Sequence, residues 1–453
     1  MGNLFGSLTS TAGALQVFER SLSTVQNNVV NANTPGYAKQ MQGLVANRFE
    51  PDRSIVGGVS AGPSYNYRDL FSERNVQTRS SMQSFEQQKV TSLTGIQSAF
   101  PVEDGAGIPA ALNNFFNAVS QLTVSPNDSS SRQVVLDRAG DVAKAFNSSA
   151  SQLAVEKADT QSTLRSNIDQ INQIGATIRE INANRRGDAA SANEPGSDAR
   201  LFSSLEELAK IVDFETIPGD DGSVSVYIGG QTPLVIGARQ YQLSSDISGG
   251  QLRVLDSAGA DISSEIRGGK VAGLLDVYNK KIPAYSAKLD ELASGFADQV
   301  NQTLSQGLDQ NGNAPIQDLF SYNGAIGAAY TMTTLGLSPD QLALAGANEA
   351  GGNANAIALT QLSEGRLINN QTFQQAYGTL AGTVGRDLSN ATSVATVQGD
   401  LLTQAKELRQ TKQGVSLDEQ AALLVQYQRA YEAASQLFKT INEMTTMILN
   451  VLQ

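Results

Sequence analysis

A heptad repeat of apolar residues runs through the last stretch of the chain, Ser416–Gln453. Its steps alternate three and four, which predicts one long helix with a coiled-coil seam. A second apolar row beside the seam widens the stripe, so this helix needs more than one neighbour to bury it. The seam consists of Leu424, Tyr427, Tyr431, Ala434, Phe438, Ile441, Thr445, Ile448 and Leu452, and the second row of Leu423, Ala430, Leu437, Met444 and Val451.

The first stretch of the chain carries a matching repeat. Its steps alternate four and three with one polar exception, so it predicts a second seam helix. Only Glu19, Arg20 and Lys39 are charged among residues 1–46, whereas a helix exposed to solvent normally carries more charge. We therefore expect a helix surrounded by protein. Its seam consists of Leu4, Leu8, Thr11, Leu15, Phe18, Leu22, Val25 and Val29.

Periodicity alone leaves two arrangements of these end helices open. They can pair with each other inside one chain as a bundle, or they can pack against other copies of the chain. The low charge of the first helix favours assembly with other copies.

Composition excludes several classes of protein. The chain has 453 residues, about three domains by length. Its 32 basic and 44 acidic residues give a net charge of −12, so we expect no nucleic acid partner. The absence of His and Cys excludes disulfides, thiolate or imidazole metal ligands and nucleophiles that depend on His. We expect no catalytic residue, no metal site and no cofactor.

The sequence also predicts no membrane insertion. It has no apolar segment of roughly 18 residues, the length that spans a bilayer. Its first residues lack the basic region and the compact apolar core of a secretory signal, because the apolar residues stand at helical spacing. If the chain is exported, we expect another route.

A proline and a glycine punctuate the end of the first helix. Pro35 lacks an amide donor and pushes Thr34 to an extended conformation, so the helix is predicted to end near residues 31–33. Gly36 then occupies the turn position where a positive φ is favourable. Residues 40–67 contain alternating apolar residues and breakers, which predicts a loop or hairpin.

Long helical segments dominate the middle of the chain. Residues 127–194 contain no proline, and an apolar stripe from Val134 to Ile181 predicts a helix too long for an ordinary globular domain. Residues 185–200, rich in Gly, Ala, Ser and Asp around Pro195, are predicted to form a loop, and 211–266 to form short strands. Further helices are predicted at 69–99, 109–122, 278–304 with a kink or break at Pro283, 355–361, 372–388 and 401–409.

These patterns predict a mainly α fold, an elongated coiled-coil helical rod built from both chain ends, with a small inserted β domain. The expected halves of the terminal coiled-coil domain are residues 1–67 and 411–453. The expected halves of the helical rod are 68–205 and 267–410, and the β domain is 206–266.

Two motifs at opposite ends carry a resemblance to a known family. Residues 28–37, Asn-Val-Val-Asn-Ala-Asn-Thr-Pro-Gly-Tyr, resemble the Asn-Ile-Ala-Asn-x-x-Thr-Pro-Gly-Tyr element of flagellar axial proteins, the rod, hook and hook-associated proteins. Residues 414–433 resemble the closing motif of the same family. Val29 and Val30 replace the usual Ile-Ala. The motif residues are Asn28, Asn31, Asn33, Thr34, Pro35, Gly36 and Tyr37.

Internal segments resemble the hook-associated group of that family over nearly the whole chain. They are the Phe115-Phe116 helix, Pro126-Asn-Asp with Arg132-Gln-Val-Val-Leu, the long helix from Leu153 to Ile181, Gly307-Leu-Asp-Gln-Asn-Gly and Asn353-Ala-Asn-Ala-Ile-Ala-Leu. The chain departs from longer members in lacking a large extra domain.

The resemblance implies a structural subunit at the junction between flagellar hook and filament. Such a protein would be exported through the flagellar channel to the extracellular flagellum and polymerise as a helical ring on the hook tip. Its implied partners are other copies of itself, the hook protein, a second hook-associated junction protein and an export chaperone. Two alternatives stay open: another flagellar axial protein of the hook or distal rod, and a secreted adhesin or an enzyme in the β insert.

Overall fold

The computed structural model describes residues 2–50, 55–103, 105–187, 194–347 and 351–451. The chain divides into two compact units. The terminal unit comprises Met1–Gln83, Gln170–Leu243 and Gln398–Gln453, and the central unit comprises Ser84–Asp169 and Ser244–Val397. Long helices from both chain ends and a small β region confirm the mainly α fold.

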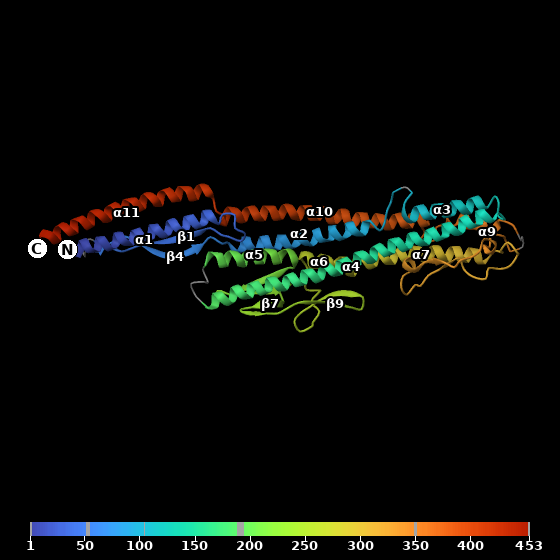
Figure 1. The fold of residues 1–453 in the computed structure, drawn as a ribbon, viewed down its shortest axis with the longest axis horizontal. Helices are drawn as coiled ribbons and strands as arrows, with labels where there is room; N and C mark the ends of the chain where they lie inside the picture. The colour runs from blue at the N-terminus through green and yellow to red at the C-terminus, as the bar shows by residue number, and fades with distance from the viewer. Residues whose placement is uncertain (1, 51–54, 104, 188–193, 348–350, 452–453) are drawn as a thin grey trace. The chain divides into compact units, whose positions relative to one another are not determined.

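Two helices from opposite chain ends pair in the terminal unit. Helix α1 (Gly2–Val30) packs along helix α11 (Leu417–Val451), with the two chain ends at the same end of the pair (Figure 1). Strands β1 (Gln40–Ala46) and β4 (Val59–Asn66) form an antiparallel pair that packs on α1, and β2 (Phe49–Glu50) pairs with β3 (Ile55–Val56). The hairpin predicted at 40–67 is therefore confirmed.

The terminal unit also holds a four-stranded antiparallel sheet in the order β5-β6-β7-β8. In β6 the buried Val226 and Ile228 alternate with the partly exposed Tyr227, as in a sheet with one buried face. Val226, Ile228, Leu234 and Val235 are fully buried. The strands are β5 (Phe214–Pro218), β6 (Val224–Ile228), β7 (Thr232–Ile236) and β8 (Arg239–Gln240).

A cluster of phenylalanines forms the core of the central unit. Phe296 lies at its centre, with ring centroids 5.6 Å from Phe115, 5.3 Å from Phe320 and 5.4 Å from Phe373. These contacts are edge-on, the geometry that aromatic pairs prefer. The cluster joins helices α3 (Gly107–Leu122), α7 (Ile282–Ser305) and α10 (Phe373–Gln413) with strand β11 (Phe320–Ser321).

The remaining elements complete the central unit or run through both units. Strands β9 (Ser244–Ser248) and β10 (Gln251–Leu255) form a hairpin, and β11 pairs with β12 (Thr333–Thr334). The shorter helical elements are α6 (Gly269–Asp276), α8 (Ala328–Thr331), η4 (Pro339–Gln341) and α9 (Ala354–Gln361). The helices with residues in both units are α2 (Leu70–Gln97), α4 (Ser129–Gly187) and α10.

The break expected at Pro283 is a π-helical turn, η3 (Val277–Lys281), just before α7. Proline has no N–H to give to the carbonyl four residues earlier, so the regular helical ladder fails there. The N–H of Ile282 donates instead to the carbonyl of Val277.

Two predictions in the middle of the chain were wrong. Of the loop predicted at 185–200, the described residues other than Glu194 are helical, because α4 continues to Gly187 and α5 (Pro195–Ile211) begins at the proline; residues 188–193 lie outside the described residues. Proline suits the first turn of a helix, and the Glu194 side chain accepts the N–H groups of Gly196 and Ser197. The separate helices predicted at 372–388 and 401–409 are one continuous helix, the 41-residue α10.

Candidate assembly site at the paired chain ends

The α1–α11 pair brings the two predicted seams together, although unequally. Val25 and Ile441 are buried, whereas Val29, Tyr431 and Ile448 are exposed. Leu452 lies outside the described residues. The other predicted interface residues, Leu4, Leu8, Leu15, Phe18, Leu22, Leu424, Tyr427 and Phe438, are half-buried.

The buried hydroxyl groups of helix α1 form hydrogen bonds to carbonyl groups of the same helix. The hydroxyl of Ser21, 1 % exposed, donates to the carbonyl of Val17 at 2.9 Å, and that of Thr11 donates to Ser7 at 2.7 Å. A buried hydroxyl without a partner would be unfavourable, but these bonds satisfy both donors. A polar, nearly uncharged helix can therefore lie against protein on several sides.

A buried polar junction centred on Asn28 holds three segments of the terminal unit together. Asn28 is 1 % exposed, and its Nδ2 donates to the carbonyl of Gln40 in β1 and to Oε1 of Gln420 in α11, each at 2.9 Å. Its Oδ1 accepts the N–H of Gln40 and the hydroxyl of Tyr37, also at 2.9 Å. One amide thus ties α1 to the hairpin and to the opposite end of the chain.

The turn after α1 places Tyr37 next to this junction. Burial raises the pKa of Tyr37 to about 12, so its hydroxyl stays protonated and donates to Asn28 at physiological pH. Thr34 donates to Oδ1 of Asn31 at 3.1 Å, and Asn31 donates to Asn27. Asn31, Thr34 and Tyr37 are therefore hydrogen-bonded to one another in the turn, and Tyr37 links the turn to Asn28.

Gly36 is required at its position for two reasons. Its φ is +74°, a conformation that side chains disfavour. A Cβ there would lie 2.3 Å from the carbonyl oxygen of Ala199 and 2.7 Å from the amide nitrogen of Ser203, both on α5. The turn thus approaches α5 more closely than any other residue allows.

Charged side chains behind the turn form a buried network. Arg68 forms ion pairs with Glu73 and with Asp198, and it donates to the carbonyl of Gly36 at 2.6 Å. Arg409 of α10 joins the network through Glu73 at 3.1 Å and Glu206 at 2.8 Å. Buried charges are tolerated when they are paired in this way, so the network fixes the turn on α2, α5 and α10.

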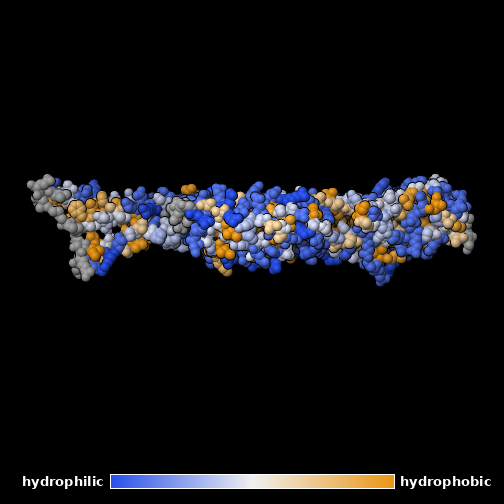
Figure 2. Space-filling model, turned by 90° about the horizontal axis from the view of Figure 1, so that it is seen from below, coloured by the Kyte–Doolittle hydropathy of each residue, from blue (hydrophilic) through white to orange (hydrophobic). Residues whose placement is uncertain are grey.

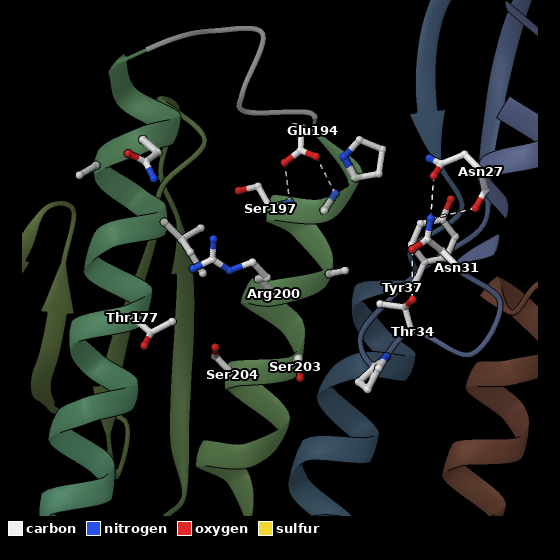
Figure 3. Close-up of a pocket in the computed structure, with 17 residues that line it drawn as sticks. Asn27, Asn31, Thr34, Tyr37, Thr177, Glu194, Ser197, Arg200, Ser203 and Ser204 are labelled. Atoms are coloured by element: carbon white, nitrogen blue, oxygen red, sulfur yellow. Dashed lines mark hydrogen bonds between the residues drawn. The ribbon is translucent and has the colours of Figure 1, made fainter. Parts of the chain in front are cut away.

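An open pocket of about 1070 Å³ lies between the motif turn and the facing ends of α4 and α5 (Figure 3). Asn27, Asn31 and Thr34 line one side of it. Glu194 and Ser197 line the other side, where the Glu194 carboxylate accepts the N–H of Ser197 and caps α5. Its walls offer hydrogen-bonding groups and little charge.

Neither metal chemistry nor a membrane span is supported within the described part of the chain. No cluster of three or more Asp or Glu side chains there could hold a metal ion. None of the helices described is long and apolar enough to cross a bilayer. The loop at Asp309, which superficially resembles a calcium loop, is a turn whose carboxylate accepts the N–H groups of Asn311 and Asn313.

Sequence reasoning missed several residues of this site. Gln420 is 1 % exposed and continues the α11 seam one step before Leu424, so a polar residue at a seam position was the available signal. Gln40, Arg68 and Arg409 gave no such signal, because their partners lie far away in the sequence.

Comparisons with known proteins agree with this architecture. Residues 93–320, half of the chain, match the model of the flagellar hook-associated protein FlgK helical domain. Residues 409–451, which include α11, match the model of the flagellar basal body rod FlgEFG protein C-terminal region. The flagellar hook junction protein FlgK from Burkholderia pseudomallei has a similar fold, with a TM-score of 0.68, 15 % identity and coverage of 75 % of this chain and 100 % of that chain.

Two relatives align with this chain over nearly their whole length. Flagellar hook-associated protein 1 of Bacillus subtilis (strain 168) is 23 % identical over 99 % of this chain and 99 % of its own length. The Escherichia coli (strain K12) protein of that name is 21 % identical over 98 % of this chain and 99 % of its length. The latter alignment is 547 positions long against 453 residues here, so the relative carries insertions that this chain lacks.

The paired end helices, the motif turn and these matches define an axial protein of the bacterial flagellum. Its role in the flagellum is structural. Within that class, the chain belongs to the FlgK family of flagellar hook-associated proteins.

Proposed function

We propose that this chain joins hook to filament by polymerising at the hook tip through α1 and α11. Its partners are then other copies of itself in a helical ring, the hook protein below and a second hook-associated protein above. An export chaperone and export to the extracellular flagellum belong to the same proposal. We infer no enzymatic activity.

The apolar surface that α11 leaves uncovered carries this proposal. Leu437 is 54 % exposed, Met444 46 % and Met447 61 %, and exposed Tyr431 and Ile448 lie on the same helix. Figure 2 shows hydrophobic side chains at the surface near the chain ends, at the left. Contiguous exposed apolar side chains mark interaction sites, and repeating subunits would cover them.

Electron microscopy of cells lacking this gene, with flagellin measured in the medium, tests the function. Hooks without filaments, together with flagellin in the medium, are the expected outcome. Missing hooks would indicate that the protein is a hook or rod subunit instead. Normal filaments would overturn the role at the junction.

Two variants test the seam itself. Leu22→Asp and Ile441→Asp each place a charge in the α1–α11 pair, which costs several kcal/mol unless the charge is paired. We expect both proteins to keep the helical signal of the central unit and to fail in restoring filaments. Ile326→Asp, at a residue of the central unit that is 65 % exposed, is the matched control and should restore them. Normal filaments with either seam variant would refute the seam.

A further inference from the structure

Two tyrosines and a methionine form an exposed patch on the β1–β4 hairpin. Met41 is 36 % exposed, Tyr65 47 % and Tyr67 41 %. Both tyrosine hydroxyls approach the Met41 sulfur, at 3.4 Å from Tyr65 and 3.0 Å from Tyr67, and the rings lie 6.0 Å apart. Tyrosine and methionine are enriched in protein interfaces because they offer large contact areas. We call this group the tyrosine–methionine patch.

A pocket of about 130 Å³ lies beside the tyrosine–methionine patch. Met41, Tyr67, Leu423 and Tyr427 contribute to its wall, which therefore joins the hairpin to α11. Its volume is about that of one inserted side chain. A central pocket that receives an anchor side chain is the usual centre of a protein interface.

The pocket also contains a polar group without a partner. Gln420 lines it, and its buried Nε2 donates to no atom of the described residues. The amide cannot flip, because its Oε1 accepts from Asn28. Such a donor is unfavourable when buried, and an acceptor supplied from outside the chain would satisfy it.

Charge indicates what kind of molecule covers this surface. Residues 1–67 and 411–453 contain seven basic and seven acidic side chains, so their net charge is zero and residues 68–410 carry the whole −12. Lys39 and Glu419, at the rim of the pocket, neutralise each other in an ion pair of 3.0 Å. Copies with a net charge of −12 repel each other, but they can meet at neutral, apolar surfaces.

We propose that a second copy of this chain docks on the tyrosine–methionine patch, inserts a side chain into the adjoining pocket and supplies an acceptor to Gln420. This inference rests on the proposed function, because it names the part of the terminal unit at which copies meet. The patch is continuous with α11 through Leu423 and Tyr427, so a copy that covers the free stripe of α11 can reach it.

Photo-crosslinking on assembled hooks tests the contact without disturbing the fold. The full chain carries a photoreactive phenylalanine analogue at position 67 and is produced in cells that lack the natural gene. Irradiation of isolated hooks should give a product of twice the mass of the chain that contains only this protein. Products with another protein alone, or none at all, would overturn the inference.

A double variant, Tyr65→Ala with Tyr67→Ala, tests the energetic importance of the patch. Loss of an interface centre should lower the amount of protein bound at hook tips at least about tenfold. Tyr330→Ala, at a tyrosine of the central unit that is 51 % exposed, is the matched control and should bind as the unchanged protein does. Binding of the double variant at the level of the unchanged protein would overturn the inference.

The two proposals fail in different ways in these experiments. If the unchanged chain is absent from hook tips, the proposed function fails. If it is present there but neither the cross-link nor the loss of binding is seen, only the tyrosine–methionine contact fails.

Discussion

Asn28 shows how one residue of a short motif can position distant parts of a chain. It sits near the end of α1, where asparagine is a weak helix former, and all of its polar atoms are used. Its partners belong to the turn, to β1 and to α11. Asn28 lies beside the seam position Val29, and its buried bond to Gln420 of α11 can fix the register of the two helices, as a single buried polar residue does in a coiled coil.

We predict that Asn28→Ala lowers the unfolding free energy of the terminal unit by about 2 kcal/mol, because Gln40 and Gln420 lose buried partners. Denaturant titration followed by proteolysis at the chain ends measures the change. Gln26→Ala changes an exposed residue of the same helix and should alter stability by less than about 0.5 kcal/mol. Equal effects of the two variants would contradict the junction.

Gly36→Ala and Gly385→Ala should change stability in opposite directions. At Gly36 the positive φ and the 2.3 Å approach to Ala199 make alanine destabilising. At Gly385, inside α10, nothing lies within 4 Å of a new Cβ, so alanine should stabilise the helix by about 0.5–1 kcal/mol. Thermal unfolding measures both, and a stabilised Gly36 variant would disprove the close approach of the turn to α5.

At the scale of elements, asparagine side chains on helical segments bind the backbone of strands and of the residues beside them. The Asn182 side chain of α4 both accepts from and donates to the backbone of Val224, at 2.9 Å each, as a neighbouring strand would. A small sheet leaves many backbone N–H and C=O groups without a neighbouring strand. Here a side chain on a helix pairs with such groups instead. The same double contact joins Asn28 to Gln40, Asn172 to Leu243, Asn279 to Leu252 and Asn301 to Phe320.

The ion pair between α5 and α10 makes the terminal unit sensitive to acid. Burial opposes ionisation of Glu206, but the hydrogen bond and charge of Arg409 outweigh it and lower the pKa of Glu206 below its usual value. A carboxyl whose pKa is lower in the folded state stabilises the fold above its unfolded pKa of about 4.3. This stabilisation is lost as the pH falls through the folded pKa.

We therefore expect Glu206→Gln to cost about 2 kcal/mol at neutral pH and to flatten the loss of stability below about pH 4.3. Urea titrations at several pH values give both quantities. Glu207→Gln changes the exposed neighbour on the same helix and serves as the control. An acid profile of Glu206→Gln that matches the unchanged protein would mean that this pair does not contribute.

At the scale of the whole molecule, charge is segregated along the sequence. The end segments 1–67 and 411–453 are neutral, and residues 68–410 carry the net charge of −12. Neutral, partly apolar surfaces favour association, whereas net charge of one sign keeps a protein soluble. The distribution therefore favours copies that meet through their ends.

We predict that self-assembly does not weaken between roughly 0.05 and 0.5 M salt, because neutral contact surfaces lose no ion pairs to screening and screening reduces the repulsion between copies of net charge −12. Leu437→Glu places a charge on the free stripe of α11, so its assembly should be weaker and should recover with salt. Ile326→Glu is the control in the central unit. Light scattering of the purified chain gives these values, and assembly of the unchanged protein that weakens as salt rises would indicate that oppositely charged surfaces meet.

Local patterns in the sequence predicted much of this molecule because their physical causes are local. The seams of α1 and α11 follow from helical periodicity, and the turn at Pro35 and Gly36 follows from backbone preferences. Composition gave a wrong prediction around Pro195. The stretch is rich in Gly and Ser and suggested a loop, yet α5 begins at that proline, and the Glu194 side chain caps its first turn.

By itself, the sequence determined the helices, the motif turn and the neutral ends, since each depends on neighbouring residues or on simple counting. Only the tertiary structure decided which polar residues meet. Asn28 and Gln420 are 392 positions apart, and Arg68 meets Asp198 across 130. Contacts at such separations depend on how whole elements pack, and no local preference encodes that packing.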